Sequence, residues 1–395
     1  MNLSPHFPPK SSLYRGWDEC LEADELRLVD RAREFSKDVL APLLARGDDN
    51  AALTKVTLKL WAQAGLQGMQ TPKALNGHGA SYMTKIRVVM EVARHSFSVA
   101  FALNNSHSMV HMVATRAPQA IRERYLEPLL KGDLVASVAL TEPRGGSDLA
   151  AMQTHARKAE GGWLVNGSKS WVTNSTITDL VVVAAQTAEG TKGIGRFLIP
   201  MSTAGVSRLG AHELAAGGAA GSGAISFDNV FVPDANMLET PGEGFKKAME
   251  SINAARVHVA AMAVAVLEGA LSQAVRYCSE RHAFGKALLE HQGLRWQLVE
   301  VASQLEAANQ LVFHAANIVQ RGGDASLASA HAKKFASSVA VAGVEQCMQA
   351  MGAASLFKEA GLARQLAEVK AAAYADGSTE ILNERIGSNL LKNYA

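Results

Sequence analysis

Asp376 stands directly before the turn Gly377-Ser378-Thr379, close to the end of the chain. A carboxylate placed in a dry pocket has a raised pKa and can act as a general base toward a weakly acidic proton. The same Asp-Gly-Ser-Thr stretch also fits the start of a helix, where the helix dipole favours an acidic side chain and lowers its pKa. The sequence therefore leaves two functions open for Asp376, a catalytic base and a helix cap.

Three other segments carry polar and aromatic side chains in spacings that suit ligand binding. The loop Thr141–Asp148 is rich in hydroxyls and unhindered N–H groups, which can hydrogen-bond the edge of a heterocycle and an anion together. Trp171 is followed two positions on by Thr173, and Arg281 three positions on by Phe284. Taken singly, the loop is an ordinary polar turn, Arg281 a helix-terminal cation and the two aromatic rings core side chains. Those interpretations weaken because all the segments occur in one chain.

The elements that must position these segments fall into three blocks. From Glu22 to about Lys131, apolar residues recur every three or four positions, as they do in amphipathic helices. We expect the first of these helices to carry Val39 on its apolar face and to end at Ala41-Pro42. This block predicts a helical domain.

The second block, from Gly132 to about Pro233, alternates short apolar runs with Gly and Asn turns. Gly161-Gly162 and Asn166-Gly167 each predict a tight hairpin turn. We therefore expect a small antiparallel β-domain. The expected strands are Leu134–Thr141, Trp163–Val165, Leu180–Gln186, Arg196–Ile199 and Ala224–Phe231.

The third block, from Gly242 to the C-terminus, is rich in Ala and again helical in pattern. Its apolar residues follow alternating steps of three and four, which predicts a tightly packed antiparallel bundle. The residues of this seam are Leu298, Val301, Leu305, Ala308, Val312, Ala315 and Val319. The whole pattern predicts an α+β multidomain fold with an N-terminal α-helical domain over 1–132, a middle antiparallel β-domain over 133–240 and a C-terminal α-helical bundle over 241–395.

Composition restricts the class of function. The 395 residues include 39 Lys and Arg against 37 Asp and Glu, a net charge of +2, which argues against nucleic acid as a partner. The most apolar stretch, Val259–Leu267, ends at Glu268, so we expect no membrane span. Residues 1–10 lack the apolar region of a signal peptide. We therefore expect a cytoplasmic protein.

Cysteine and histidine spacings give no sign of a disulfide framework or a metal site. Cys20, Cys278 and Cys347 lie far apart in the chain, which fits a reducing cytosol. His107 and His111 are one helical turn apart, but no carboxylate or third ligand lies nearby in sequence, and zinc needs three or four ligands. We expect no metal.

Two motifs in combination resemble the acyl-CoA dehydrogenase family of flavoproteins. They are Thr-Glu-Pro-x-x-Gly-Ser-Asp at 141–148 and Glu-Arg-x-x-Phe-Gly-x-x-x-x-x-x-Gln at 280–292. The resemblance covers nearly the whole chain in the same α–β–α order and implies a C-terminal four-helix bundle. It further implies FAD as cofactor, lying at a subunit interface of a homotetramer, an acyl-CoA substrate and an electron-transferring flavoprotein as the usual electron acceptor.

The resemblance also implies roles for single residues. Thr141 and Thr173 would hydrogen-bond the flavin ring, with Trp171 beside it, and residues of a neighbouring subunit would hold the pyrophosphate and adenine. The implied cofactor-binding residues are Leu140, Thr141, Gly146, Ser147, Trp171, Thr173, Arg281, Phe284, Gln292, Gln349, Gly352, Ser378 and Glu380. The implied substrate-binding residues are Ser147, Asn253, Arg256 and Gly377. At Gly352-Ala353 the paired glycines of the family are reduced to one.

The implied reaction removes an α-proton from a thioester and passes a β-hydride to flavin N5. The family base is usually Glu just before Gly-Thr or Gly-Ser, and this chain has Asp376 there. Some relatives carry the base next to Arg256, where this chain has Ala255, so Asp376 is the candidate base. Asp is shorter than Glu and Ala375 beside it is small, so we expect room for a branched or alicyclic acyl group.

Other members of the superfamily remain alternatives. Flavin oxidases of the nitroalkane oxidase type also use Asp, but they would keep an Arg seven residues after the base, where this chain has Asn383. Non-redox members such as desulfinases lack the carboxylate, and a catalytically silent FAD-binding subunit is a further possibility. The absence of Arg between Ser96 and Val113 disfavours a glutaryl-type dicarboxylate.

Overall fold

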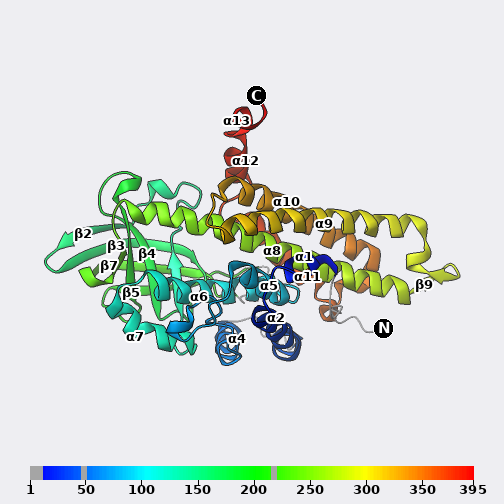
Figure 1. The fold of residues 1–395 in the computed structure, drawn as a ribbon, viewed down its shortest axis with the longest axis horizontal. Helices are drawn as coiled ribbons and strands as arrows, with labels where there is room; N and C mark the ends of the chain where they lie inside the picture. Colours follow the sequence, from blue (N-terminus) through cyan, green and yellow to red (C-terminus); the bar gives the residue numbers. More distant parts are fainter. Residues whose placement is uncertain (1–11, 46–50, 215–219) are drawn as a thin grey trace. The chain divides into compact units, whose positions relative to one another are not determined.

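The computed structural model describes residues 12–45, 51–214 and 220–395, so the N-terminal residues considered above as a signal peptide lie outside the described part. The chain forms two compact units (Figure 1). Unit 1 comprises Met1–Arg46, Ser81–Ala100 and Ile252–Ala395, and unit 2 comprises Gly47–Ala80 and Phe101–Ser251.

Unit 1 is built from helices. Figure 1 shows α9 and α10 running side by side, with α12 and α13 continuing away from them at the C-terminal end. The helices are α1 (Arg15–Asp18), α2 (Ala23–Phe35), α3 (Ala41–Ala45), α5 (Tyr82–Ala93), most of α8 (Glu243–Glu280), α9 (Gln292–Gln320), α10 (Ser326–Met351), α11 (Leu362–Lys370), α12 (Thr379–Gly387) and α13 (Leu390–Tyr394), with the hairpin β9 (His282–Ala283) and β10 (Lys286–Ala287) after α8.

The seam predicted on α9 is confirmed from Leu298 to Ala315, whereas Val319 at its end is only half-buried. Close helix approach depends on small residues. A Cβ at Gly343 of α10 would lie 2.5 Å from Cδ1 of Leu267 on α8, so a larger residue there would force the Leu267 side chain to move. The bundle is held by interdigitating apolar side chains.

The first long helix differs from the prediction. After α2 the chain makes a π-helical turn over Ser36–Leu40 and continues into α3, which contains Pro42 in its first turn, so the helix does not end at Ala41-Pro42. A π-turn contains one residue more than an α-helical turn, so the residue that faces the core comes one position later in the sequence. Leu40 is therefore fully buried, and Val39 is only half-buried.

Unit 2 combines an eight-stranded sheet with helices. The strand order is β6-β7-β3-β2-β4-β5-β8, with β1 parallel to β4 and most other pairs antiparallel. The strands are β1 (Ala136–Ala139), β2 (His155–Ala159), β3 (Gly162–Val172), β4 (Leu180–Gln186), β5 (Ile194–Pro200), β6 (Val206–Ala211), β7 (Gly223–Pro233) and β8 (Met237–Glu239). The helices are α4 (Ala51–Gln63), most of α6 (Phe97–Arg116) and α7 (Gln119–Leu130).

Residues of α6 and α7 pack on one face of this sheet. Met109 and Val113 of α6 and Leu129 of α7 share a buried cluster with Leu180 and Leu198 of the sheet. A second cluster, which includes Val165, Phe197 and Phe227, forms among the strands themselves. The sheet thus contributes buried apolar side chains to two clusters, one shared with α6 and α7 and one formed by strand residues alone.

The hairpin turn predicted at Asn166-Gly167 is wrong, because both residues lie inside β3. The pairing of β3 with β7 shifts its register between Val165 and Gly167, which marks a β-bulge. Gly167 has φ +136°, and a Cβ there would lie 2.7 Å from Cα of Thr154. Glycine is required here by a close approach of two strands. The other predicted turn exists one residue earlier than expected, because Glu160 and Gly161 connect β2 to β3 and Gly162 is the first residue of β3.

Among the described residues, one helix, α8, is long and apolar enough to cross a membrane. Its apolar window has a mean hydropathy of 1.5, and 83% of that window is buried inside the protein. Such burial fits a core helix, and it agrees with the short apolar run that the sequence shows at Val259–Leu267.

Candidate active site

Asp376 lies in the turn that leads into α12, and the structure gives this turn an unusual backbone. Asp376 has φ +54° and Gly377 has φ +103°, so two consecutive residues occupy left-handed conformations. Such a conformation disfavours most side chains and is tolerated best by Gly, Asn and Asp. Ser378, not Asp376, occupies the N-cap position of α12. The helix-cap interpretation of Asp376 is therefore wrong.

Two cations from other helices of unit 1 hold the carbonyl groups of this turn. Nε of Arg256 on α8 donates to the main-chain oxygen of Asp376 across 3.0 Å. Nζ of Lys333 on α10 donates to the main-chain oxygen of Gly377. Arg256 also donates from Nη1 to Oδ1 of Asn253, one helical turn earlier, across 3.0 Å. The turn that contains Asp376 is thus tied to α8 and α10.

The surroundings of Asp376 favour the protonated form of its carboxyl. Burial raises the pKa of the Asp376 carboxyl, and the positive charges of Lys333 and Arg256 offset only part of that rise. Burial also lowers the pKa of Lys333 to about 8, although Asp376 opposes this change. A carboxylate whose pKa is raised binds a proton more readily than an ordinary Asp, which is the property that a general base requires.

Lys333 was not identified from the sequence, although a signal for it was present. The pair Lys333-Lys334 lies in α10, and the buried residues Ser329, Lys333, Ala336 and Ala340 follow helical steps of four, three and four. Lys333 is 0% exposed, whereas Lys334 faces solvent. A lysine on the buried stripe of an Ala-rich helix must find an acceptor, because a buried ammonium without one is costly.

The loop Thr141–Asp148 of unit 2 is anchored by a buried ion pair that the sequence also did not reveal. Oε1 of Glu142 lies 2.9 Å from Nζ of Lys169, and that ammonium also donates to the main-chain oxygen of Leu140 across 3.0 Å. Glu142 further accepts from the backbone N–H groups of Gln153 and Thr154, at 2.7 and 2.8 Å. Gly146 and Ser147, beyond this anchor, are exposed.

The structure brings Thr141 close to the segment that contains Trp171 and Thr173. The N–H of Ser170 donates to the main-chain oxygen of Thr141 across 2.9 Å. A register shift between Lys169 and Val172 follows, and Trp171 adopts φ +56° with 57% of its side chain exposed. A bulge of this kind re-aims a side chain. The Trp171 ring contacts His212 with centroids 4.8 Å apart, while Thr173 is buried.

The residues expected to reach a cofactor of a neighbouring subunit share one property, which is exposure. Phe284 is 97% exposed at the tip of the β9–β10 hairpin, where it has φ +51°. The other exposed members are Arg281, Gln292, Gln349 and Gly352, and Glu380 is exposed in the first turn of α12. Aromatic side chains and Arg are enriched at protein interfaces, so this exposed set is compatible with a binding surface.

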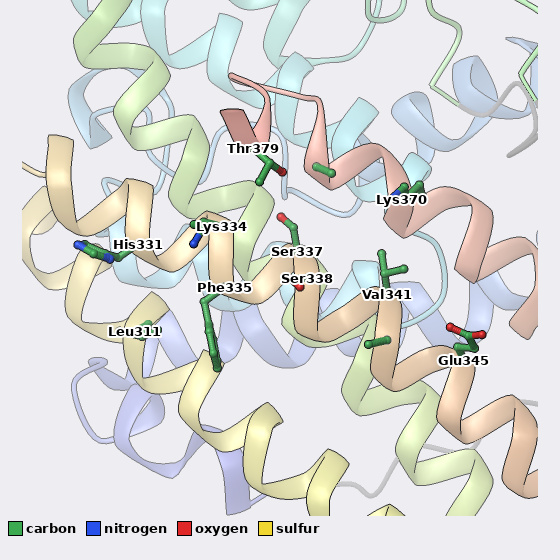
Figure 2. A pocket seen from close by; sticks show the side chains of 12 residues that line it. Leu311, His331, Lys334, Phe335, Ser337, Ser338, Val341, Glu345, Lys370 and Thr379 are labelled. Carbon is green, nitrogen blue, oxygen red and sulfur yellow. The ribbon is translucent and has the colours of Figure 1, made fainter. Parts of the chain in front are cut away.

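A pocket of about 580 Å³ lies on the face of α10 near the start of α12. Figure 2 shows Ser337 and Thr379 on this pocket, with Lys334 and Phe335 on neighbouring turns of α10. Its lining also includes Lys370. Asp376 is not among the residues that line this pocket.

Comparison with known sequences covers almost all of the chain. The sequence models of the N-terminal, middle and C-terminal domains of acyl-CoA dehydrogenase match residues 22–133, 137–230 and 242–391. An acyl-CoA dehydrogenase of Bacillus subtilis is 31% identical over 372 residues, which span 93% of this chain and 98% of the relative.

Solved structures agree. Butyryl-CoA dehydrogenase from Megasphaera elsdenii has a TM-score of 0.86 at 30% identity, covering 94% of this chain and 99% of that chain. A chain solved in work on the electron transferring flavoprotein of Acidaminococcus fermentans has a TM-score of 0.88 at 29% identity, with coverages of 94% and 99%.

Proposed function

Because this chain belongs to the acyl-CoA dehydrogenase family, we propose that it dehydrogenates an acyl-CoA thioester between its α and β carbons, with Asp376 as the base. The chain has the three-domain fold of the family, is an oxidoreductase acting on CH–CH bonds and uses FAD. The observation that carries the assignment of Asp376 is its raised pKa in a turn tied to two buried cations.

The residues of this chain fit FAD in two respects. Trp171 presents an exposed ring next to Thr141 and Thr173, which suits a planar heterocycle with hydrogen-bonding edges. Arg281 and Phe284 are exposed and offer a cation and a ring for the pyrophosphate and adenine of a second copy. When bound, FAD supplies the oxidant that accepts the hydride. The remaining proposed contacts come from Leu140, Gly146, Ser147, Gln292, Gln349, Gly352, Ser378 and Glu380.

In the proposed reaction the residues of this chain act on the α-proton and on the thioester carbonyl of the substrate. Asp376 would accept the α-proton on its carboxylate, and its own main-chain N–H would donate to the thioester oxygen as charge develops there. Gly377 leaves that approach free of a side chain, and Ser147 and Asn253 are proposed to contact the substrate. Arg256 stays a candidate for contact with the CoA portion; within the chain its Nε donates to the main-chain oxygen of Asp376 and its Nη1 to Oδ1 of Asn253.

We propose a branched or alicyclic acyl group as the substrate. Asp376 carries one methylene fewer than the usual Glu, so the substrate α-carbon must come closer to the turn, and Ala375 leaves space beside it. Anaerobic mixing of the FAD-loaded protein with a panel of acyl-CoA thioesters tests both proposals through loss of the flavin absorbance. Straight-chain thioesters that reduced the flavin faster than cyclic ones would contradict the substrate proposal.

The same panel separates the proposed function from its nearest rival. An oxidase of the nitroalkane type would consume oxygen without an added electron acceptor and would act on a small substrate without CoA. A dehydrogenase needs an acceptor, and we propose an electron-transferring flavoprotein. Flavin bleaching by a thioester without oxygen uptake would support the dehydrogenase.

We also propose a cytoplasmic homotetramer with domains over 1–132, 133–240 and 241–395. The exposed Arg281, Phe284 and Gln349 support assembly, since residues that hold a cofactor of another copy must face outward in a single chain. Mass measurement of the FAD-loaded protein by light scattering tests the tetramer.

A further inference from the structure

Two consecutive carbonyl groups at the base-bearing turn accept hydrogen bonds from two buried cations on different helices. Nζ of Lys333 on α10 donates to the carbonyl of Gly377, and Nε of Arg256 on α8 donates to the carbonyl of Asp376. Lys333 is 0% exposed and Arg256 is 6% exposed. A buried ammonium is costly unless it is both hydrogen-bonded and near an opposite charge, and here Gly377 supplies the acceptor and Asp376 the charge.

The backbone conformation of the turn explains why these two hydrogen bonds are needed. Asp376 and Gly377 both have positive φ, at +54° and +103°. A side chain held in a sparsely populated backbone conformation persists only when surrounding contacts determine it. A Cβ at Gly377 would lie 3.2 Å from Nη2 of Arg256, so the guanidinium packs closely against the turn.

We propose that Lys333 is a positioning residue that, together with Arg256, fixes the left-handed turn carrying Asp376 and supplies a positive charge beside its carboxylate. This inference rests on the proposed function of Asp376 as the base. It concerns a residue that touches the turn through its backbone, so Lys333 acts on the reaction through Asp376.

The charges around the turn determine the direction of the effect. Asp376 faces Lys333 from α10 and Arg256 from α8, and Arg256 is in turn influenced by Arg385 of α12. Both neighbouring cations lower the pKa of Asp376 against the larger effect of burial. Loss of the Lys333 charge therefore raises the pKa of Asp376 further. Because the pKa of Lys333 is about 8, this influence is present below that pH.

Two substitutions separate the hydrogen bond from the charge. Lys333→Met removes both, whereas Lys333→Gln keeps a donor for the Gly377 carbonyl without the charge. Lys334→Met is the matched control, because Lys334 is the adjacent lysine of the same helix and faces solvent. We expect Lys333→Met to slow flavin reduction by about 10- to 100-fold at pH 7, since small displacements of a catalytic group have large effects.

The pH dependence distinguishes positioning from a general loss of stability. In both Lys333 variants the apparent pKa in the pH profile of the flavin reduction rate should rise by about one unit. This is the usual effect of removing a neighbouring opposite charge. Lys333→Gln should recover most of the wild-type rate at high pH, because its turn is still held. Lys334→Met should match the wild type. Unchanged pH profiles in both Lys333 variants would overturn the inference.

A second measurement needs no turnover. The unfolding free energies of the wild type and Asp376→Asn are compared between about pH 4 and pH 8, because an unperturbed Asp titrates near 3.9. A folded-state pKa above that value makes the wild type progressively less stable than Asp376→Asn as pH rises to the folded pKa. In the Lys333→Met background this difference should become larger and reach its plateau at higher pH.

The two measurements keep this inference apart from the proposed function. If no acyl-CoA reduces the flavin but the unfolding comparison shows the coupling, the proposed function fails and the link between Lys333 and Asp376 stands. If thioesters reduce the flavin and neither the pH profile nor the unfolding difference responds to Lys333→Met, the positioning role is wrong while the proposed function stands.

Discussion

Nε of Arg256 donates a hydrogen bond across 3.0 Å to the main-chain carbonyl oxygen of Asp376. The arginine is contributed by α8 and the aspartate by the turn before α12, far apart in sequence but within unit 1. Through this contact Arg256 helps to hold the turn that contains Asp376. The residues that hold Asp376 should therefore affect the rate of proton abstraction more than they affect substrate binding.

Arg256→Lys should lower kcat with little change in KM. A lysine keeps the positive charge but lacks the planar guanidinium that donates to Asp376 and Asn253 at the same time. We expect kcat to fall by about 100-fold, the effect of a displacement near 1 Å. Steady-state kinetics with the best thioester of the panel measures the split. A raised KM with an unchanged kcat would instead indicate that Arg256 binds the CoA portion.

Asp376→Asn should abolish most flavin reduction while leaving the cofactor bound. The amide has almost the same shape but accepts no proton, and a positioned general base contributes about 10²- to 10⁴-fold. Anaerobic stopped-flow absorbance measures the rate, and the flavin spectrum measures occupancy. Asp324→Asn is the control, because Asp324 is an exposed residue that accepts a hydrogen bond from Ser326 before α10. Persistent reduction in Asp376→Asn would show that another group removes the proton.

The rate of flavin reduction should rise with pH through an apparent pKa above the ordinary value for Asp. Proton abstraction needs the ionised carboxylate, and burial raises the pKa of Asp376 despite Lys333 and Arg256. The rate is therefore low while Asp376 is protonated and levels off above its folded-state pKa. Stopped-flow measurements from about pH 4 to pH 9 cover this range. A flat profile over the whole range would contradict the raised pKa.

The sequence predicted elements whose signal is local. The apolar steps of α9 correctly predicted the buried residues from Leu298 to Ala315, because burial in a helix follows a short period. The strand β4 also has its predicted bounds, since a continuous apolar run between turns has few other structures open to it. The motif loop before β2 and the turn at Asp376 were likewise visible as short patterns.

Features that depend on contacts between residues far apart in the sequence could not be predicted from local patterns. Asn166-Gly167 has the composition of a hairpin turn, but pairing with β7 and the close approach of Thr154 place it inside a strand. The π-turn that buries Leu40 instead of Val39 has no local signature of the same strength. Lys333 could have been found only by following the buried stripe of α10 residue by residue.

Lys169→Met should destabilise the protein and weaken FAD binding together. Lys169 is fully buried, pairs with Glu142 and donates to the carbonyl of Leu140, at the start of the loop proposed to bind the flavin. Removing one partner of a buried ion pair leaves the other charge uncompensated and costs about 3 to 5 kcal/mol. The free energy of unfolding comes from urea titration at pH 7, and the FAD dissociation constant from flavin fluorescence.

The matched control for Lys169→Met is Lys131→Met. Lys131 pairs with Glu127 at the surface of the same unit, with both side chains more than half exposed, and such pairs contribute about 0 to 1 kcal/mol.

The pH dependence of the free energy of unfolding gives a further check. Burial alone would raise the pKa of Glu142, but hydrogen bonds from Thr154 and Gln153 and the Lys169 ion pair bring it below 4.5. The stabilisation is then present at neutral pH and is lost as Glu142 becomes protonated in acid, so the difference between wild type and Lys169→Met should narrow below about pH 4.5. Equal stability losses in the buried and the surface variants would show that the loop is held by its backbone contacts alone.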